Sequence, residues 1–277
     1  MDSIFVSARA SLLELQDERE IVIRNCRDIT AYSKKIIFSG QRIKAVPIRS
    51  GNYKEIKTNF SIIALRLAQV NESYIASAQK GSLRGTIASA CEELIEALTF
   101  IYYVGNKKLL SYEKMVEIIK GMIRANTGNN IDELILDKAL KACVYDDEQE
   151  LEEVEVDVEL AIIDRPDYFM GLFDLTGEIM RFTITNLQDY RSELDSGFTF
   201  ENYTFMKALY AEVCSFLNKY PKLSVYKGEW SNRHDPKGAS VLRKKLEVFK
   251  QSLSKVEKSL FQVLVRGKEE VSLQDIN

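Results

Sequence analysis

The sequence predicts an all-α protein, a bundle of about seven helices, from three observations. Helix-breaking residues are scarce, because the 277 residues include only 4 Pro and 13 Gly. Apolar residues recur at three- and four-residue spacing through long segments, as on the buried face of a helix. A hydrophobic content of 45% is sufficient for a sizeable core. We expect residues 1–277 to form a single helical domain.

Three long helices are expected in the N-terminal part of the chain. The first lies within residues 2–40, a segment without Pro. The second covers about 52–79, and Gly81 and Gly85 are expected to separate it from the third, which covers about 86–104. The third segment is apolar nearly all round, so we expect it at the centre of the bundle.

Further helical segments are expected over about 112–125, 132–144, 166–186, 201–219 and 238–265. Ser111 is the expected N-cap of the first of these, and Pro166 fits the first turn of the third. Two stretches are expected to lack regular structure. One is an acidic loop over about 146–160, and the other is a polar, irregular stretch over about 221–238.

Charge and cysteine content narrow the class of protein. A net charge of -3 carries no global basic signature of nucleic-acid binding, although a local basic patch remains open. The four cysteines are scattered and His234 is the only histidine, which argues against structural zinc and favours free thiols in a reducing compartment. The first residues lack a secretory leader pattern and no segment has 18 consecutive apolar residues, so we expect a soluble, intracellular protein.

Four carboxylates stand out in otherwise apolar helical segments. Glu93 and Glu96 are three residues apart, and Asp174 and Glu178 are four apart, so each pair lies on one face of its helix. Like charges at this spacing destabilise a helix by roughly 0.2–0.5 kcal/mol per pair. A compensating cation would explain them, and a hard divalent metal ion is the usual one.

Two interpretations of these carboxylates stay open from the residues alone. Each pair could form a solvent-facing stripe, with Arg181 pairing with Glu178. If the two helices pack side by side, the pairs could instead converge, as in the metal sites of helical bundles. An all-oxygen site favours Mg²⁺ or Mn²⁺ over zinc. Such ions serve phosphoryl chemistry, which indicates phosphodiester substrates.

Basic residues gather after the first long helix and at its end. They are compatible with contacts to RNA phosphates, and equally with ordinary solvated helix ends. The residues that we predict to bind RNA are Lys34, Lys35, Arg42 and Lys44.

Three segments resemble the translin-associated factor X branch of the translin family. They are residues 27–38, 167–181 and 253–258, the last followed by Val265-Arg266-Gly267. The resemblance implies a seven-helix α fold that assembles with translin into a closed hetero-oligomer. It also implies Mg²⁺-dependent endoribonuclease activity on single-stranded or nicked RNA, in the removal of passenger strands during RNA silencing and in the processing of transfer-RNA fragments. It places the protein in the cytoplasm and nucleus.

The resemblance also assigns roles to the four carboxylates. The family pattern Glu-x-x-Glu-Ala falls on Glu93 and Glu96, and Asp-Leu-Thr-Gly-Glu falls on Asp174 and Glu178. Glu93, Glu96 and Asp174 would hold Mg²⁺ (Mn²⁺ is possible), and Glu178 would be a further ligand or the base that positions water. Translin itself lacks the first acidic pair, so the catalytic subunit is favoured. The alternative is a non-catalytic scaffold that stabilises translin and binds RNA.

Overall fold

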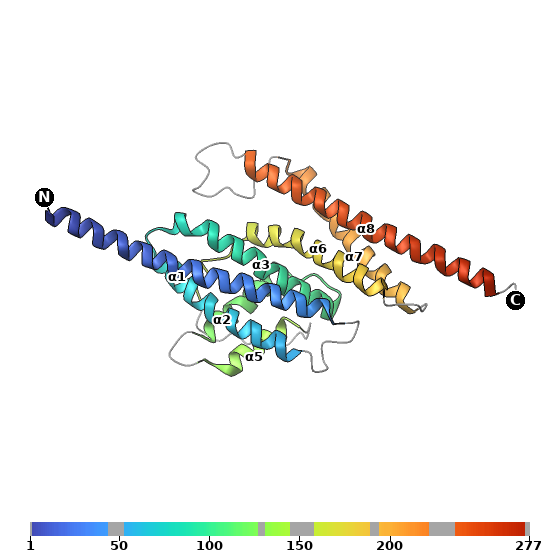
Figure 1. Ribbon diagram of the computed structural model, residues 1–277, viewed down its shortest axis with the longest axis horizontal. Helices are drawn as coiled ribbons and strands as arrows, with labels where there is room; N and C mark the ends of the chain where they lie inside the picture. Colours follow the sequence, from blue (N-terminus) through green and yellow to red (C-terminus); the bar gives the residue numbers. More distant parts are fainter. Residues whose placement is uncertain are drawn as a thin grey trace. The chain divides into compact units, whose positions relative to one another are not determined.

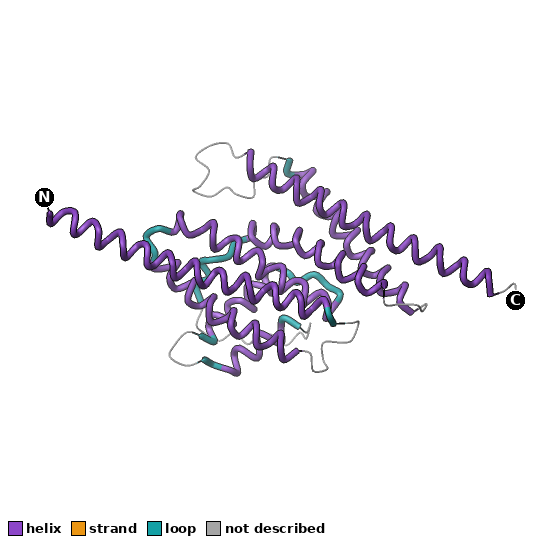
Figure 2. The backbone as a smooth tube through the Cα atoms, viewed as in Figure 1, coloured by secondary structure: helices purple, strands orange, loops and turns teal. Residues whose placement is uncertain are grey.

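The computed structural model describes an all-helical protein. The described parts of the chain contain eight α-helices and no strand, which confirms the predicted fold class (Figure 2). They divide into two compact units, here called unit 1 (Met1–Gly171) and unit 2 (Leu172–Asn277). The boundary falls inside one helix. The residues that the structure describes are 2–43, 53–126, 131–144, 158–188, 194–221 and 236–274.

The helices are labelled in Figure 1, and their bounds are α1 Asp2–Gln41, α2 Tyr53–Ala76, α3 Lys80–Asn106, α4 Tyr112–Arg124, α5 Glu133–Ala142, α6 Arg165–Gln188, α7 Leu194–Lys219 and α8 Pro236–Gln274. Unit 1 contains α1 to α5 and the first turns of α6, and unit 2 contains the rest of α6 with α7 and α8. Every predicted helical segment corresponds to one of these helices. The predicted single domain stays a prediction.

Three helix ends differ from the sequence prediction. Helix α3 begins before Gly81 and Gly85, which were expected to lie outside it. Each glycine costs about 1 kcal/mol in a helix. Arg84, which lies between the two glycines, is held by contacts with Ile162 and with Asp167 of α6, and those contacts favour the extra turns. Helix α7 also begins earlier than expected, and α8 continues through Gly267.

The core of unit 1 lies where α1 packs against α2 and α3 (Figure 1). Helix α3 is buried on nearly all sides, as its sequence predicted, and α4 packs against α2 and α5. The Ser111 side chain accepts a hydrogen bond from the Lys114 amide at 3.2 Å, which confirms the predicted cap of α4. Side chains at the centre of this core include Ile29, Ile36, Phe60, Leu67, Leu94 and Phe100.

Unit 2 is held together by aromatic packing among its three helices. Phe249 of α8 meets Phe173 of α6 and Tyr210 of α7 edge-on, with ring centroids 6.4 and 5.2 Å away. Between α6 and α7, the buried Asn202 side chain donates a 3.0 Å hydrogen bond to the Thr183 hydroxyl. These contacts fix the face of α6 that carries Asp174 and Glu178 relative to α8.

Two predicted loops fall mostly outside the described residues. These are residues 145–157 of the acidic loop and residues 222–235 of the irregular stretch, which include His234. The four cysteines are free thiols, three of them buried, as predicted. Among the helices that the structure describes, none combines the length and apolar character needed to cross a membrane.

Candidate active site

Helix α6 begins in unit 1, in close contact with α3. A Cβ atom added at Gly171 would lie 2.6 Å from Ile95 Cγ2 and 3.3 Å from the Glu92 carbonyl oxygen. Only glycine allows the two helix backbones to approach this closely. The contact lies beside the predicted acidic residues of α3, and Asp174 follows Gly171 by one turn of the same helix.

The start of α6 is capped by two aspartates that bond to each other's backbone. Asp164 Oδ1 accepts from the Asp167 amide at 3.2 Å, and Asp167 Oδ2 accepts from the Asp164 amide at 2.9 Å. This reciprocal arrangement is a capping box, and it satisfies helix-terminal N–H groups that have no partner within the helix. It explains why the helix begins just before Pro166, as the sequence predicted.

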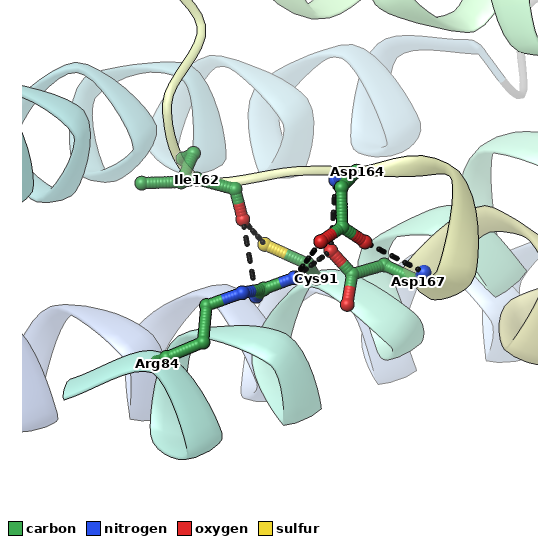
Figure 3. Close-up of polar contacts among 5 residues, drawn as sticks. All are labelled: Arg84, Cys91, Ile162, Asp164 and Asp167. Carbon is green, nitrogen blue, oxygen red and sulfur yellow. Dashed lines mark hydrogen bonds and ion pairs between the residues drawn. The ribbon is translucent and has the colours of Figure 1, made fainter. Parts of the chain in front are cut away.

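Arg84 of α3 joins this cap (Figure 3). Its Nη2 lies 2.5 Å from Asp167 Oδ2 and 3.0 Å from Asp164 Oδ2, while Nη1 donates to the Ile162 carbonyl at 3.5 Å. The Cys91 thiol donates to the same carbonyl at 3.6 Å. We call Arg84, Asp164 and Asp167 the arginine clamp. It fastens the first turn of α6 to α3 within unit 1.

Burial dominates the electrostatics of the clamp. Asp167 is only 4% exposed, and burial raises its pKa to about 7 although Arg84 and the Asp164 amide act to lower it. Burial alone would lower the pKa of Arg84, but the two aspartates outweigh that effect and raise it, so the guanidinium stays charged. Burial also raises the pKa of the Cys91 thiol, which is therefore a poor nucleophile.

The first predicted acidic pair lies on α3 in unit 1. Glu93 and Glu96 are half-buried, whereas their neighbours Leu94 and Ile95 are fully buried. Lys34 of α1 places its ammonium 3.3 Å from Glu93 Oε1. The pair is therefore a narrow polar stripe on a buried helix, at the edge of the α1–α3 contact.

The second predicted pair lies on α6 in unit 2. The ammonium of Lys245, from α8, is 2.6 Å from Asp174 Oδ2. Glu178 is buried and pairs with Arg181, with 3.2 Å between Oε1 and Nη1. The pairing of Arg181 with Glu178, one of the two alternatives from the sequence, is thus present.

The two acidic pairs belong to different units, and each has cationic partners from its own unit. Among the described residues, no group of three or more His, Cys, Asp or Glu side chains is arranged to hold a metal ion. The donor set nevertheless fits magnesium, which prefers oxygen ligands and commonly takes one or two carboxylates together with substrate phosphates. Each unit supplies one such pair.

The residues predicted to bind RNA already have contacts within unit 1. Lys34 pairs with Glu93, and the Lys35 ammonium lies 4.2 Å from the centre of the Tyr32 ring. Arg42 pairs with Glu55 at 3.4 Å. The remaining residue of this set, Lys44, is outside the described residues. The RNA-binding assignment stays a prediction.

Two residues of the site region had no signal in the sequence. Arg84 contacts residues 78 to 83 positions further along the chain, a separation that helical periodicity does not connect. Lys245 is one of three consecutive basic residues in α8, with Arg243 and Lys244, and nothing in that run distinguishes it. Three consecutive basic residues indicate a basic segment in α8, but they do not predict a contact with Asp174.

Comparison with known proteins connects this arrangement to one family. Translin-associated protein X of Rattus norvegicus is 26% identical over 265 residues, covering 96% of this chain and 79% of the relative. The Schizosaccharomyces pombe homolog of that protein is 25% identical over 279 residues, covering 96% of this chain and 89% of the relative. The similarity is therefore nearly full-length.

A solved structure shows the same fold. The crystal structure of apo-NeC3PO matches with a TM-score of 0.58 at 14% identity, covering 94% of this chain and 96% of that one. The model of the family described as "Translin family" matches residues 17–267. This span includes both acidic pairs and the arginine clamp. The chain therefore belongs to the translin family.

Proposed function

We propose that this chain is the catalytic subunit of a translin-containing, Mg²⁺-dependent endoribonuclease that cleaves single-stranded or nicked RNA. The roles that the family resemblance implies are the removal of passenger strands in RNA silencing and the processing of transfer-RNA fragments, in the cytoplasm and nucleus. The names of the relatives, "Translin-associated", support translin as the partner. The oligomer would supply the rest of the RNA-binding surface.

One observation carries the proposal. Two helices that are otherwise packed with buried apolar residues both place a pair of carboxylates at three- or four-residue spacing, Glu93 with Glu96 and Asp174 with Glu178. Such acids cost stability unless a cation offsets them.

The residues would divide the chemistry among themselves. Glu93, Glu96 and Asp174 would hold Mg²⁺ through their carboxylate oxygens. When bound, the ion supplies positive charge to the scissile phosphate and makes a water molecule easier to deprotonate. Glu178 would hold the attacking water, as a further ligand or as the base that accepts its proton.

Hydrolysis then follows from this placement. The water oxygen forms a bond to phosphorus while the bond from phosphorus to the leaving ribose oxygen breaks. The water proton passes to Glu178, and the leaving oxygen takes a proton from solvent. Glu178 then releases this proton to solvent, so the carboxylates are unchanged at the end of the cycle.

The test is cleavage by the complex of this chain with translin. Changing Asp174→Ala or Glu96→Ala should reduce Mg²⁺-dependent cleavage of a single-stranded RNA oligonucleotide by about 100-fold or more, because each removes a charge that holds the ion. Glu212→Ala, which removes an exposed acid of α7 in unit 2, is the matched control and should cleave normally. Size-exclusion chromatography checks that each variant assembles with translin.

A second candidate is a non-catalytic scaffold that stabilises translin and binds RNA. The observation that favours it is that Glu93, Asp174 and Glu178 each have a basic partner within their own unit. A scaffold would leave cleavage unchanged in the Asp174→Ala and Glu96→Ala complexes. It would also leave the chain without measurable Mn²⁺ binding, which electron paramagnetic resonance of free Mn²⁺ detects.

A further inference from the structure

We propose that the exposed face of α1 between residues 24 and 42 binds single-stranded RNA, with the Phe38 ring stacking on a base. The inference rests on the RNA substrate of the proposed function, and it adds the surface and the mode by which that RNA is held. This surface lies within unit 1. We call it the basic row, and its members are Arg24, Arg27, Lys35, Phe38 and Arg42.

Helical spacing places the basic row on one side of α1. When the exposed Ala31 is counted, its members follow one another at intervals of three or four residues, and Arg42 directly follows the last residue of the helix. All of them are exposed, whereas Cys26, Ile29 and Ile36 on the other side of α1 are buried in the core of unit 1. At the α-helical rise of about 1.5 Å per residue, the row is about 27 Å long.

The charge of this part of α1 is suited to an anionic chain. Residues 24–42 contain five cations, because Lys34 lies beside the row, and a single acid, Asp28. That acid is neutralised by Arg66 of α2, whose Nε lies 2.9 Å from Asp28 Oδ2. By contrast, residues 10–20 of the same helix contain four acids and one arginine. The positive charge is therefore local to the row, although the whole chain has a net charge of -3.

The cations of the row are available to phosphate groups. Neither Arg24 nor Arg27 forms an ion pair with another residue that the structure describes. Arg42 pairs with Glu55 at 3.4 Å, but both side chains are more than half exposed. An exposed pair of this kind contributes little to stability, so a phosphate can replace the carboxylate at small cost.

Phe38 adds an aromatic surface to the row. The residue is 62% exposed, and the guanidinium carbon of Arg42 lies 4.5 Å from the centre of its ring. An exposed phenylalanine needs no explanation by itself. An exposed ring within a row of cations, however, combines the two features with which proteins hold single strands: a surface on which bases stack and charges that contact the backbone. The position of Phe38 in the row is therefore what indicates RNA.

These features select a single strand over a duplex and require no particular sequence. A base can stack on Phe38 only when it is not already stacked within a double helix. Stacking and phosphate contacts do not read the edges of the bases, so any base is accepted. The surface holds the strand, and the cleavage reaction belongs to the carboxylates of the proposed site.

The experiment measures the RNA affinity of the full chain in complex with translin, in EDTA so that no cleavage occurs. Fluorescence anisotropy follows a labelled single-stranded RNA oligonucleotide and a duplex RNA of the same length. Phe38→Ala removes the ring, and Phe38→Trp keeps an aromatic surface. Phe200→Ala removes a ring of α7 that is 58% exposed and lies outside the row, so it is the matched control. Arg27→Gln removes one charge of the row, and Arg9→Gln, at an exposed position nearer the start of α1, is its control.

We expect Phe38→Ala to weaken the binding of single-stranded RNA by about tenfold, the effect of losing one base–aromatic stack, and to leave duplex binding within about twofold of normal. Phe38→Trp should bind the single strand within about threefold of normal. Arg27→Gln should reduce the slope of log affinity against log salt concentration by about 0.7, the value for one phosphate contact on a single strand. Phe200→Ala and Arg9→Gln should leave both quantities unchanged.

Other outcomes overturn the inference and separate it from the proposed function. Binding of the single strand by Phe38→Ala within about twofold of normal contradicts stacking, and so does an equal loss for the duplex. Failure of Phe38→Ala to assemble with translin, seen by size-exclusion chromatography, would place the ring in a subunit interface instead. Each of these results leaves the endoribonuclease proposal to be decided by Asp174→Ala and Glu96→Ala. If the unmodified complex binds no single-stranded RNA, both proposals fail together.

Discussion

Two aspartates on the same helix, seven residues apart, have opposite surroundings. Asp167, in the first turn of α6 and in unit 1, is 4% exposed and is bonded to Arg84 and to the Asp164 amide. Asp174, in unit 2, is 38% exposed and forms an ion pair with Lys245. The first carboxylate is enclosed in a network with its partners, whereas the second lies at a surface where solvent reaches it.

The difference separates an acid that holds the fold from one that is suited to chemistry. Removing the partner of a buried, fully bonded charge strongly destabilises the fold, because it leaves an uncompensated ion inside the protein. A half-exposed pair contributes little to stability and can exchange partners at small cost. Both acids are aspartates on the same helix, so what distinguishes them is their burial and the number of bonds that each one makes.

The largest effect on stability is expected when the arginine clamp is opened. Arg84→Met should lower the free energy of unfolding by about 3 kcal/mol, at the lower end of the range for breaking a buried pair, because Asp167 can take up a proton when its partner is lost. Denaturant unfolding of the full chain measures this. Arg66→Met is the matched control, since it breaks the half-exposed pair with Asp28 in the same unit and should cost about 1 kcal/mol or less.

The same variant also tests the division between the two aspartates. Well below its unfolding temperature, Arg84→Met in complex with translin should cleave RNA at a rate within about threefold of normal. A loss of cleavage as large as that of Asp174→Ala, with stability unchanged, would place the clamp in the catalytic machinery and remove the contrast.

A smaller effect on stability is expected at Gly171, which lies between the two aspartates in the sequence and where α6 contacts α3. Gly171→Ala should destabilise the chain by about 1–3 kcal/mol, because its new methyl group would lie 2.6 Å from Ile95 Cγ2 in a packed interface. Gly85→Ala, at an exposed position of α3 with no atom within 4 Å of the added carbon, should stabilise it by about 0.5–1 kcal/mol. Thermal unfolding of both variants gives the sign. Equal shifts would show that α3 and the start of α6 are not in close contact at this position.

The sequence predicted the helices well because their periodicity is local. The cap at Ser111 was predictable for the same reason, since the capping residue and its partner are three positions apart. The acidic pairs were also found from spacing. What could not be found was which cations meet them, because Lys245 is 71 positions from Asp174 and depends on how α8 packs.

The start of α3 shows the same limit in another form. Gly81 and Gly85 are local signals for a helix end, and a tertiary contact outweighed them. Arg84 lies between the two glycines and bonds to Asp167 in the cap of α6, 83 positions away. This contact stabilises the helical conformation of the segment, so α3 begins before the glycines. Local propensity decides helix ends only where no distant partner competes.

The last expected effect is a dependence of stability on pH, between about pH 4 and 7, that comes from Asp167. Its folded pKa of about 7 lies above the ordinary carboxyl value of 3.8, so the folded chain binds this proton more tightly than the unfolded chain. The contribution is fully present below about pH 4 and is lost as pH rises to about 7, with a slope of at most about 1.4 kcal/mol per pH unit. Among the described residues, the ionisable groups that interact with Asp167 include Arg84, Asp164, the neutral Cys91 thiol and Tyr112. Asp167→Asn keeps an oxygen for the Asp164 amide but cannot titrate, so its unfolding free energy should fall less steeply than normal between pH 4 and 7. Asp174→Asn, the same change at the half-exposed aspartate, is measured beside it as the control. Parallel curves for all three would mean that Arg84 keeps Asp167 ionised throughout, and that its ion pair outweighs burial in setting the charge of the clamp.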